Sequence, residues 1–93
     1  MRIEDQILIE VKPFINQGNV EGLQHLWNEY HNEIDWDTPI AWDYVFQKSY
    51  LHAALKKQKE ICIWLDTLFS TFDPITQIAL RQLFPYARYL LTK

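Results

Sequence analysis

The 93-residue sequence has little of what marks several common classes of protein. Its single cysteine cannot form an internal disulfide or a four-cysteine zinc site, so we expect a reducing intracellular compartment. No apolar run approaches the roughly 20 residues that a membrane span requires. The first five residues carry acids where a signal peptide carries bases, which favours a cytoplasmic protein.

Positive charge is also scarce. Nine Lys and Arg residues stand against twelve Asp and Glu residues, for a formal net charge of -3. Such a balance gives no overall attraction toward nucleic acid or an anionic membrane. Lys56, Lys57 and Lys59 do cluster at a predicted helix end, where cations complement the helix dipole. We therefore expect neither nucleic acid nor membrane as a partner.

Two glycines and four prolines punctuate the chain sparsely, which favours long helices over the frequent turns of an all-β domain. By contrast, 48% of the residues are hydrophobic and 15% are aromatic, enough for one core but not two. The composition predicts a single all-α domain over residues 1–93. Apolar spacing of three and four divides it into five or six short helices.

The helices are bounded by a few recognisable signals. Gly18 and Asn19 end a first helix, which should kink or restart at Pro13, and begin a second helix that reaches about residue 31. Thr38 and Pro39 are typical of the start of a long central helix over about 39–56, which is apolar on most sides. A fourth helix is predicted over about 59–70.

The remaining chain is expected to close the structure as a C-terminal pair of capping helices. Asp73 and Pro74 predict the start of a fifth helix, and Pro85 separates it from a short sixth helix over 86–92. The spacing predicts that the fifth helix turns a stripe of four residues inward, namely Ile75, Ile78, Ala79 and Leu83.

The sequence also aligns with itself at an offset of 39 residues, which places residues 18–26 on 57–65. In the second copy, Leu51-His52-Ala53-Ala54 precedes a break, after which Glu60-Ile61-Cys62 and Trp64-Leu65 follow. This order resembles the helix pair of an ankyrin repeat, in a degenerate form of the kind that large DNA viruses carry. Lys57 stands where that family has a glycine, and the match covers about half of the chain.

The resemblance implies antiparallel helical hairpins stacked in sequence order, with His52 as a hydrogen-bonded packing residue. It also implies that binding uses the loops between repeats and the adjacent surface of the inner helices. Its viral style would place the protein in the host cytoplasm.

Residues capable of catalysis or metal binding do not form a recognised motif. Cys62, between two isoleucines, is predicted to be a buried thiol with a raised pKa, and His25 and Glu29 to be a surface pair. The sequence lacks a phosphate-binding glycine loop and any metal-binding spacing. We therefore expect no enzyme, no cofactor and no metal, with a small metal protein or enzyme built on His25, His31 and nearby acids as the least favoured alternative.

The connector over residues 32–39 is the most distinctive segment because it alternates acids with large apolar residues. Trp36, between two aspartates, either folds back over the hairpin or faces a partner. The leading hypothesis is a protein interaction module that binds through the connector and the adjacent helix surface. The predicted partner-binding residues are Glu33, Asp35, Trp36, Asp37 and Trp42. The alternative is a homo-oligomer formed through Trp64, Tyr86 and Tyr89.

Overall fold

The computed structural model describes residues 2–32 and 40–92, and this part of the chain contains six helices and no strand. The helices are α1 (Ile3–Gln17), α2 (Val20–Asn32), α3 (Trp42–Leu55), α4 (Lys59–Phe69), α5 (Pro74–Leu80) and α6 (Leu83–Thr92). The expectation of an all-helical chain is therefore confirmed.

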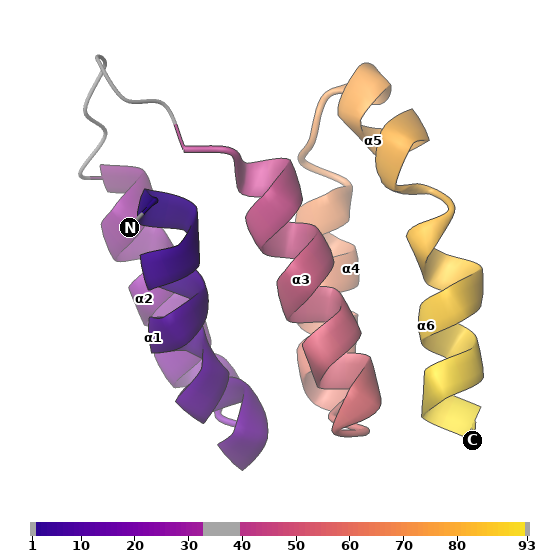
Figure 1. Ribbon diagram of the computed structural model, residues 1–93, viewed down its shortest axis with the longest axis horizontal. Coiled ribbons are helices and arrows are strands. Elements are labelled where there is room, and N and C mark those ends of the chain that lie inside the picture. The colour runs from indigo at the N-terminus through magenta and orange to yellow at the C-terminus, as the bar shows by residue number, and fades with distance from the viewer. Residues whose placement is uncertain (1, 33–39, 93) are drawn as a thin grey trace.

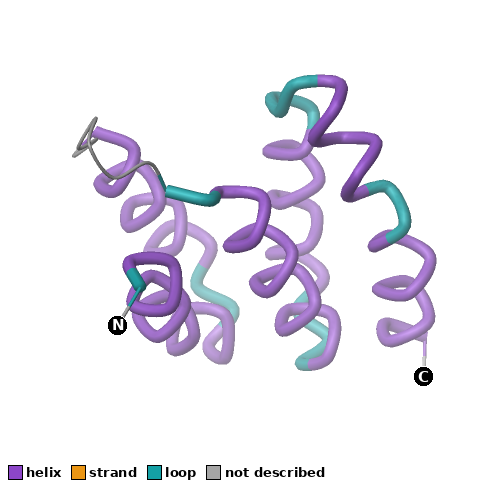
Figure 2. Tube along the Cα trace, turned by 45° about the horizontal axis from the view of Figure 1, so that its top comes forward, coloured by secondary structure: helices purple, strands orange, loops and turns teal. Residues whose placement is uncertain are grey.

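The helices lie in two rows. Figure 1 shows α1, α3 and α6 side by side and running in the same direction, and Figure 2 shows α2 and α4 behind them. Helix α3 is central, since it packs against α1 on one side and α6 on the other and also contacts α4. The prediction that this helix is buried by neighbours on both flanks is confirmed.

An aromatic cluster joins α3 to the C-terminal half of the chain. The fully buried ring of Phe46 lies 6.2 Å from that of Phe69 and meets Phe72 edge-on at 5.3 Å. Phe84 in turn meets Tyr50 at 5.3 Å and Phe69 at 4.7 Å, both edge-on. Edge-to-face pairs of this kind add about 0.5–1.5 kcal/mol beyond the area they bury. The high aromatic content therefore fills the junction of α3, α4 and α6.

The turn between α1 and α2 depends on the left-handed backbone of Gly18. Its φ of 68° places it where a residue without a Cβ has no steric penalty. The amides of Gly18 and Asn19 donate to the carbonyls of Ile15 and Phe14, as in a Schellman motif. A Cβ on Gly18 would lie 2.9 Å from Oε1 of Gln58, so close packing also favours glycine.

Lys57 adopts the same backbone conformation at the turn between α3 and α4. Its φ is 59°, and the structure describes no other non-glycine residue with a positive φ. The amides of Lys57 and Gln58 donate to Ala54 and Ala53. These partners lie 39 residues after those of Gly18 and Asn19, so the two turns share one hydrogen-bonding pattern at the offset of the sequence repeat.

Several predicted helix limits are wrong. Helix α1 runs through Pro13 as one element, so the restart that was one of the two expectations there does not occur. The long central helix begins at Trp42, not at Pro39, which lies outside the described residues. The break near the C-terminus falls at residues 81–82. Pro85 lies in the first turn of α6, where a missing amide hydrogen leaves no helical bond unmade.

The predicted inner stripe of α5 is also wrong in part. Ile75 and Ile78 are 80% and 65% exposed and Ala79 is exposed, whereas Leu80 and Leu83 are buried. Helix α5 lies across one end of the molecule, so only its last turn reaches the core (Figure 1). Seven residues suffice for it because Asp73 caps its start, accepting from the amide of Thr76 at 3.1 Å.

The two left-handed turns predict opposite effects of substitution. Lys57→Gly should raise the free energy of unfolding by about 0.5–1 kcal/mol, because it removes a Cβ from a left-handed position. Gly18→Ala should lower it by about 1–2 kcal/mol for the reverse reason. Chemical denaturation measures both, with Lys56→Gly as the control that should bring no gain. A destabilised Lys57→Gly variant would contradict the assignment of the turn.

Candidate functional site

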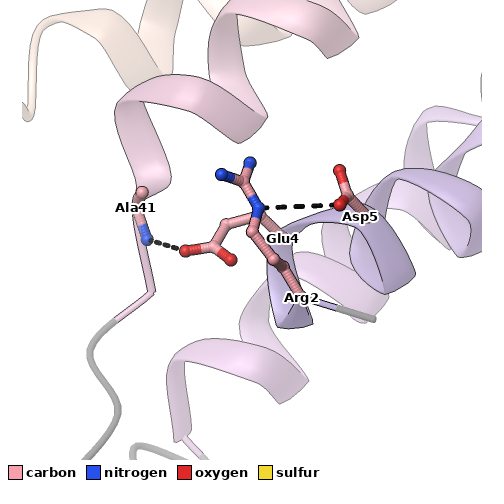
Figure 3. Close-up of polar contacts among 4 residues, drawn as sticks. All are labelled: Arg2, Glu4, Asp5 and Ala41. Atoms are coloured by element: carbon pink, nitrogen blue, oxygen red, sulfur yellow. Dashed lines mark hydrogen bonds and ion pairs between the residues drawn. The ribbon is translucent and has the colours of Figure 1, made fainter.

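The residues that join the connector to α3 are held in place by a hydrogen bond to α1. Four of the predicted partner-binding residues lie outside the described residues, namely Glu33, Asp35, Trp36 and Asp37. The segment that follows them is held by Glu4 in the first turn of α1, whose Oε1 accepts a hydrogen bond of 3.0 Å from the amide of Ala41 (Figure 3). This bond lowers the pKa of Glu4. Ala41, which leads into α3, is therefore held beside the start of α1.

Trp42, the fifth predicted residue, is half-buried in a cluster of tryptophans. Its ring lies 5.0 Å from that of the buried Trp27, which in turn meets the half-buried Trp64 edge-on at 5.7 Å. The cluster ties the start of α3 to α2 and α4. Trp42 therefore packs against its own chain and leaves only part of its ring for another molecule.

Cations line the surface where α1 meets α3. The guanidinium of Arg2 lies 4.8 Å from the ring centre of Tyr44, and Nζ of Lys48 lies 5.8 Å from the same ring. Arg2 also approaches Asp5, with Nε 3.5 Å from Oδ2, as Figure 3 shows. Both cations lie within the distance at which an aromatic face attracts positive charge. Arg2 and Lys48 therefore bring positive charge to the first turns of α3.

Next along this surface is a shallow groove of about 220 Å³ between α1 and α3. Its lining is formed by Leu8, Ile9, Val11, Lys12, Ile15, Lys48, Ser49 and His52. Ile9 is 58% exposed, Lys12 and Lys48 are exposed, and no acidic residue contributes to the lining. The groove is therefore an apolar surface bordered by positive charge.

Ser49 stands out within this lining. It is 1% exposed, and its Oγ has no hydrogen-bond partner among the described residues. A buried hydroxyl without a partner costs about 1–3 kcal/mol. Sequence reasoning missed Ser49, although it lies four residues after Val45 on the α1-facing side of α3 and interrupts an apolar stripe there. A single polar residue within an apolar stripe is therefore the sequence signal that could have identified Ser49.

His52 borders the groove and is a packing residue, as the ankyrin resemblance implied. Its Nε2 lies 2.8 Å from Oδ1 of Asn16 in α1. Partial burial, together with the charges of Lys12 and Lys56, lowers the pKa of His52. Its ring is therefore mainly neutral at physiological pH, and it adds no charge to the groove.

Cys62 lies on the other side of α3 from His52. Burial and the neighbouring Asp66 raise the pKa of its thiol to about 11, which agrees with the prediction of a buried thiol with a raised pKa. Asp66 also accepts a hydrogen bond of 2.8 Å from the hydroxyl of Tyr50. Cys62 and His52 line different grooves, so the arrangement forms no nucleophile and base pair.

The structure also gives the positions of the other predicted residues that it describes. His25 and Glu29 form the expected surface pair, with Nε2 3.0 Å from Oε1, while the side chain of His31 lies outside the described part. Within the described residues, no three His, Cys, Asp or Glu side chains gather as a metal site would require. Tyr86 and Tyr89, predicted for self-association, are 55% and 57% exposed. None of the described helices has the length and apolarity that crossing a membrane demands.

The raised pKa predicts how Cys62 responds to thiol reagents. At about pH 8 only about one thiol in a thousand is ionised when its pKa is near 11, and the thiolate is the reactive form. Modification of the folded protein by a disulfide reagent should be at least ~100-fold slower than in denaturant. Absorbance of the released thiol measures both rates. Equal rates would show that Cys62 is accessible.

The lowered pKa of His52 predicts a loss of stability in mild acid. The unfolded chain binds a proton on this ring below about pH 6.5, and the folded chain does so only at lower pH. Its contribution is therefore present above that pH and is lost as the pH falls. Between about pH 7.5 and pH 5, stability should fall less in His52→Gln than in the unmodified protein. Denaturant titrations at each pH measure this, and parallel curves would contradict it.

Comparison of the chain with protein-family models, with curated proteins and with solved structures found no match. The assignment of a function therefore depends on the surface features of the chain itself.

Proposed function

We propose that the protein is a non-enzymatic interaction module, built as stacked antiparallel hairpins of ankyrin-like type, that acts inside the cell. Its partner protein binds across the α1–α3 groove and the connector that leads into α3. The groove is the observation that carries this proposal, because it joins an exposed apolar residue, Ile9, to the bordering cations Lys12 and Lys48. An apolar centre with a polar rim is the general layout of a protein–protein interface.

The charges of the surface indicate the kind of segment that would bind. Lys12 and Lys48 border the groove, and an acidic side chain of the partner would pair with them. An apolar side chain beside that acid would cover Ile9 and fill a volume of about 220 Å³, which suits one large residue. We therefore propose an acidic segment with an apolar anchor as the partner's contribution.

The connector would add the second half of the interface. The hydrogen bond from Ala41 to Glu4 fixes its exit beside the start of α1. The connector residues proposed to contact the partner are Glu33, Asp35, Trp36 and Asp37, together with the exposed part of Trp42. Tryptophan is enriched among residues that dominate binding energy, which supports the role proposed for Trp36.

The test begins with capture of the partner on the unmodified chain and its identification by mass spectrometry. Ile9→Asp and Trp36→Ala should each weaken its binding at least ~10-fold, because each removes apolar area from the interface. Both variants should keep the free energy of unfolding within about 1 kcal/mol, as measured by denaturation.

The matched control is Ile75→Asp, which changes an isoleucine of α5 that is 80% exposed and remote from the groove. It should bind as the unmodified protein does. Binding unaffected by both Ile9→Asp and Trp36→Ala would overturn the proposal. A large loss of stability in Trp36→Ala would show instead that this ring belongs to the core.

A further inference from the structure

The two hairpins of the chain repeat their buried positions as well as their turns. Helix α1 buries Ile7, Val11 and Ile15. Helix α3 buries residues 39 positions later, namely Phe46, Tyr50 and Ala54. Together with the matching hydrogen bonds around Gly18 and Lys57, this indicates that α1 with α2 and α3 with α4 are equivalent units.

Helix α6 occupies the third position in the front row. It packs against α3 on the side opposite α1 and runs in the same direction (Figure 1). Its buried residues Leu83 and Ala87 follow Val45 and Ser49 of α3 at a constant separation of 38 residues. Helix α6 therefore corresponds to the first helix of a third unit.

Each of the first two units has a second helix that packs behind the first. Helix α2 contacts α1 and α4, and Trp27 of α2 meets Trp64 of α4 edge-on. No described helix takes the corresponding place behind α6 and beside α4, as Figure 2 shows. A third unit would have its second helix there.

That place is a groove of about 540 Å³. Its lining comes mainly from α4 and α6 and consists of Tyr50, Lys59, Cys62, Ile63, Asp66, Phe84, Arg88 and Leu91. Ile63 is 64% exposed at its edge, although it is an isoleucine in the middle of a helix. The groove therefore offers apolar surface from both α4 and α6.

The charged residues of the groove favour an acidic partner over a second copy of the chain. Lys59 and Arg88 are exposed and form no ion pair within the described ranges. Asp66 is engaged by the hydroxyl of Tyr50. Two copies laid face to face would both present this lining, with two cations against one carboxylate, so the paired faces would carry an excess of positive charge. Acidic side chains flanking an apolar stripe would complement them.

The geometry points to this groove as the binding site for an amphipathic helix of a partner protein, with acidic residues beside its apolar stripe. Apolar residues spaced three and four apart cover Ile63 and Leu91, and flanking carboxylates pair with Lys59 and Arg88. Helix α2 is the internal template, since it buries Leu23 and Trp27, four residues apart, in the equivalent place. The site is separate from the α1–α3 groove, and the inference does not depend on the function proposed for that groove.

The experiment uses two labelled synthetic helices of about four turns, with the apolar spacing of α2 and either glutamate or lysine at the flanking positions. Fluorescence anisotropy with the full chain measures their binding. The glutamate peptide should bind at least ~10-fold more tightly than the lysine peptide, and salt should reduce the difference. Ile63→Asp should weaken binding of the glutamate peptide at least ~10-fold, while Ile75→Asp should leave its affinity unchanged.

A charge reversal gives a second, independent readout. The double variant Lys59→Glu with Arg88→Glu should prefer the lysine peptide, and both positions are exposed, so the fold should remain as judged by circular dichroism. Failure of the glutamate peptide to bind the unmodified chain, equal binding of the two peptides, or no response to Ile63→Asp would overturn the inference. So would a dimer in size-exclusion chromatography that Ile63→Asp dissociates, because the occupant would then be a second copy.

Discussion

The packing of α3 between two parallel neighbours is the constraint on which the rest of the structure depends. Helices α1, α4, α5 and α6 all pack against it, and α2 reaches its start through the ring of Trp27, which lies against Trp42. A helix in this position must be apolar on two faces and must carry small side chains where its neighbours approach closely. Ala53 and Ala54 provide these small side chains, while Phe46 and Tyr50 reach the more distant helices. In a chain of 93 residues, one such helix suffices to organise the core.

The same constraint explains why the candidate surfaces lie where they do. Side chains at the two edges of α3 are only partly covered, and each edge becomes a groove with the helix beside it or behind it. Ser49 lies at one edge and the hydroxyl of Tyr50 at the other, so each groove has a polar group near its base. Among the described residues Tyr50 has a hydrogen-bond partner and Ser49 has none. The α1 side of α3 therefore carries the cost of a buried, unpaired hydroxyl, and the α6 side does not.

Sequence pattern predicted the features that depend on a residue's immediate neighbours. The turn at Gly18, the cap at Asp73 and the burial of Cys62 follow from local spacing. Ile75 and Ile78 were mispredicted because periodicity identifies an apolar face but not whether another helix lies against it. The grooves could not be predicted either, since Lys12 and Lys48, or Lys59 and Arg88, come together only through tertiary packing. Four of the five predicted partner-binding residues lie outside the described chain.

The tryptophan cluster has a consequence for how the molecule can be observed. Three of the four tryptophans, Trp27, Trp42 and Trp64, meet where α2, α3 and α4 converge. Rings 5.0 Å apart couple their electronic transitions, so the near-ultraviolet dichroism and fluorescence of the chain report mainly on this one junction. Helices α5 and α6 contain no tryptophan. Their detachment would be almost silent by these methods and visible only through the tyrosines or by exchange of backbone hydrogens.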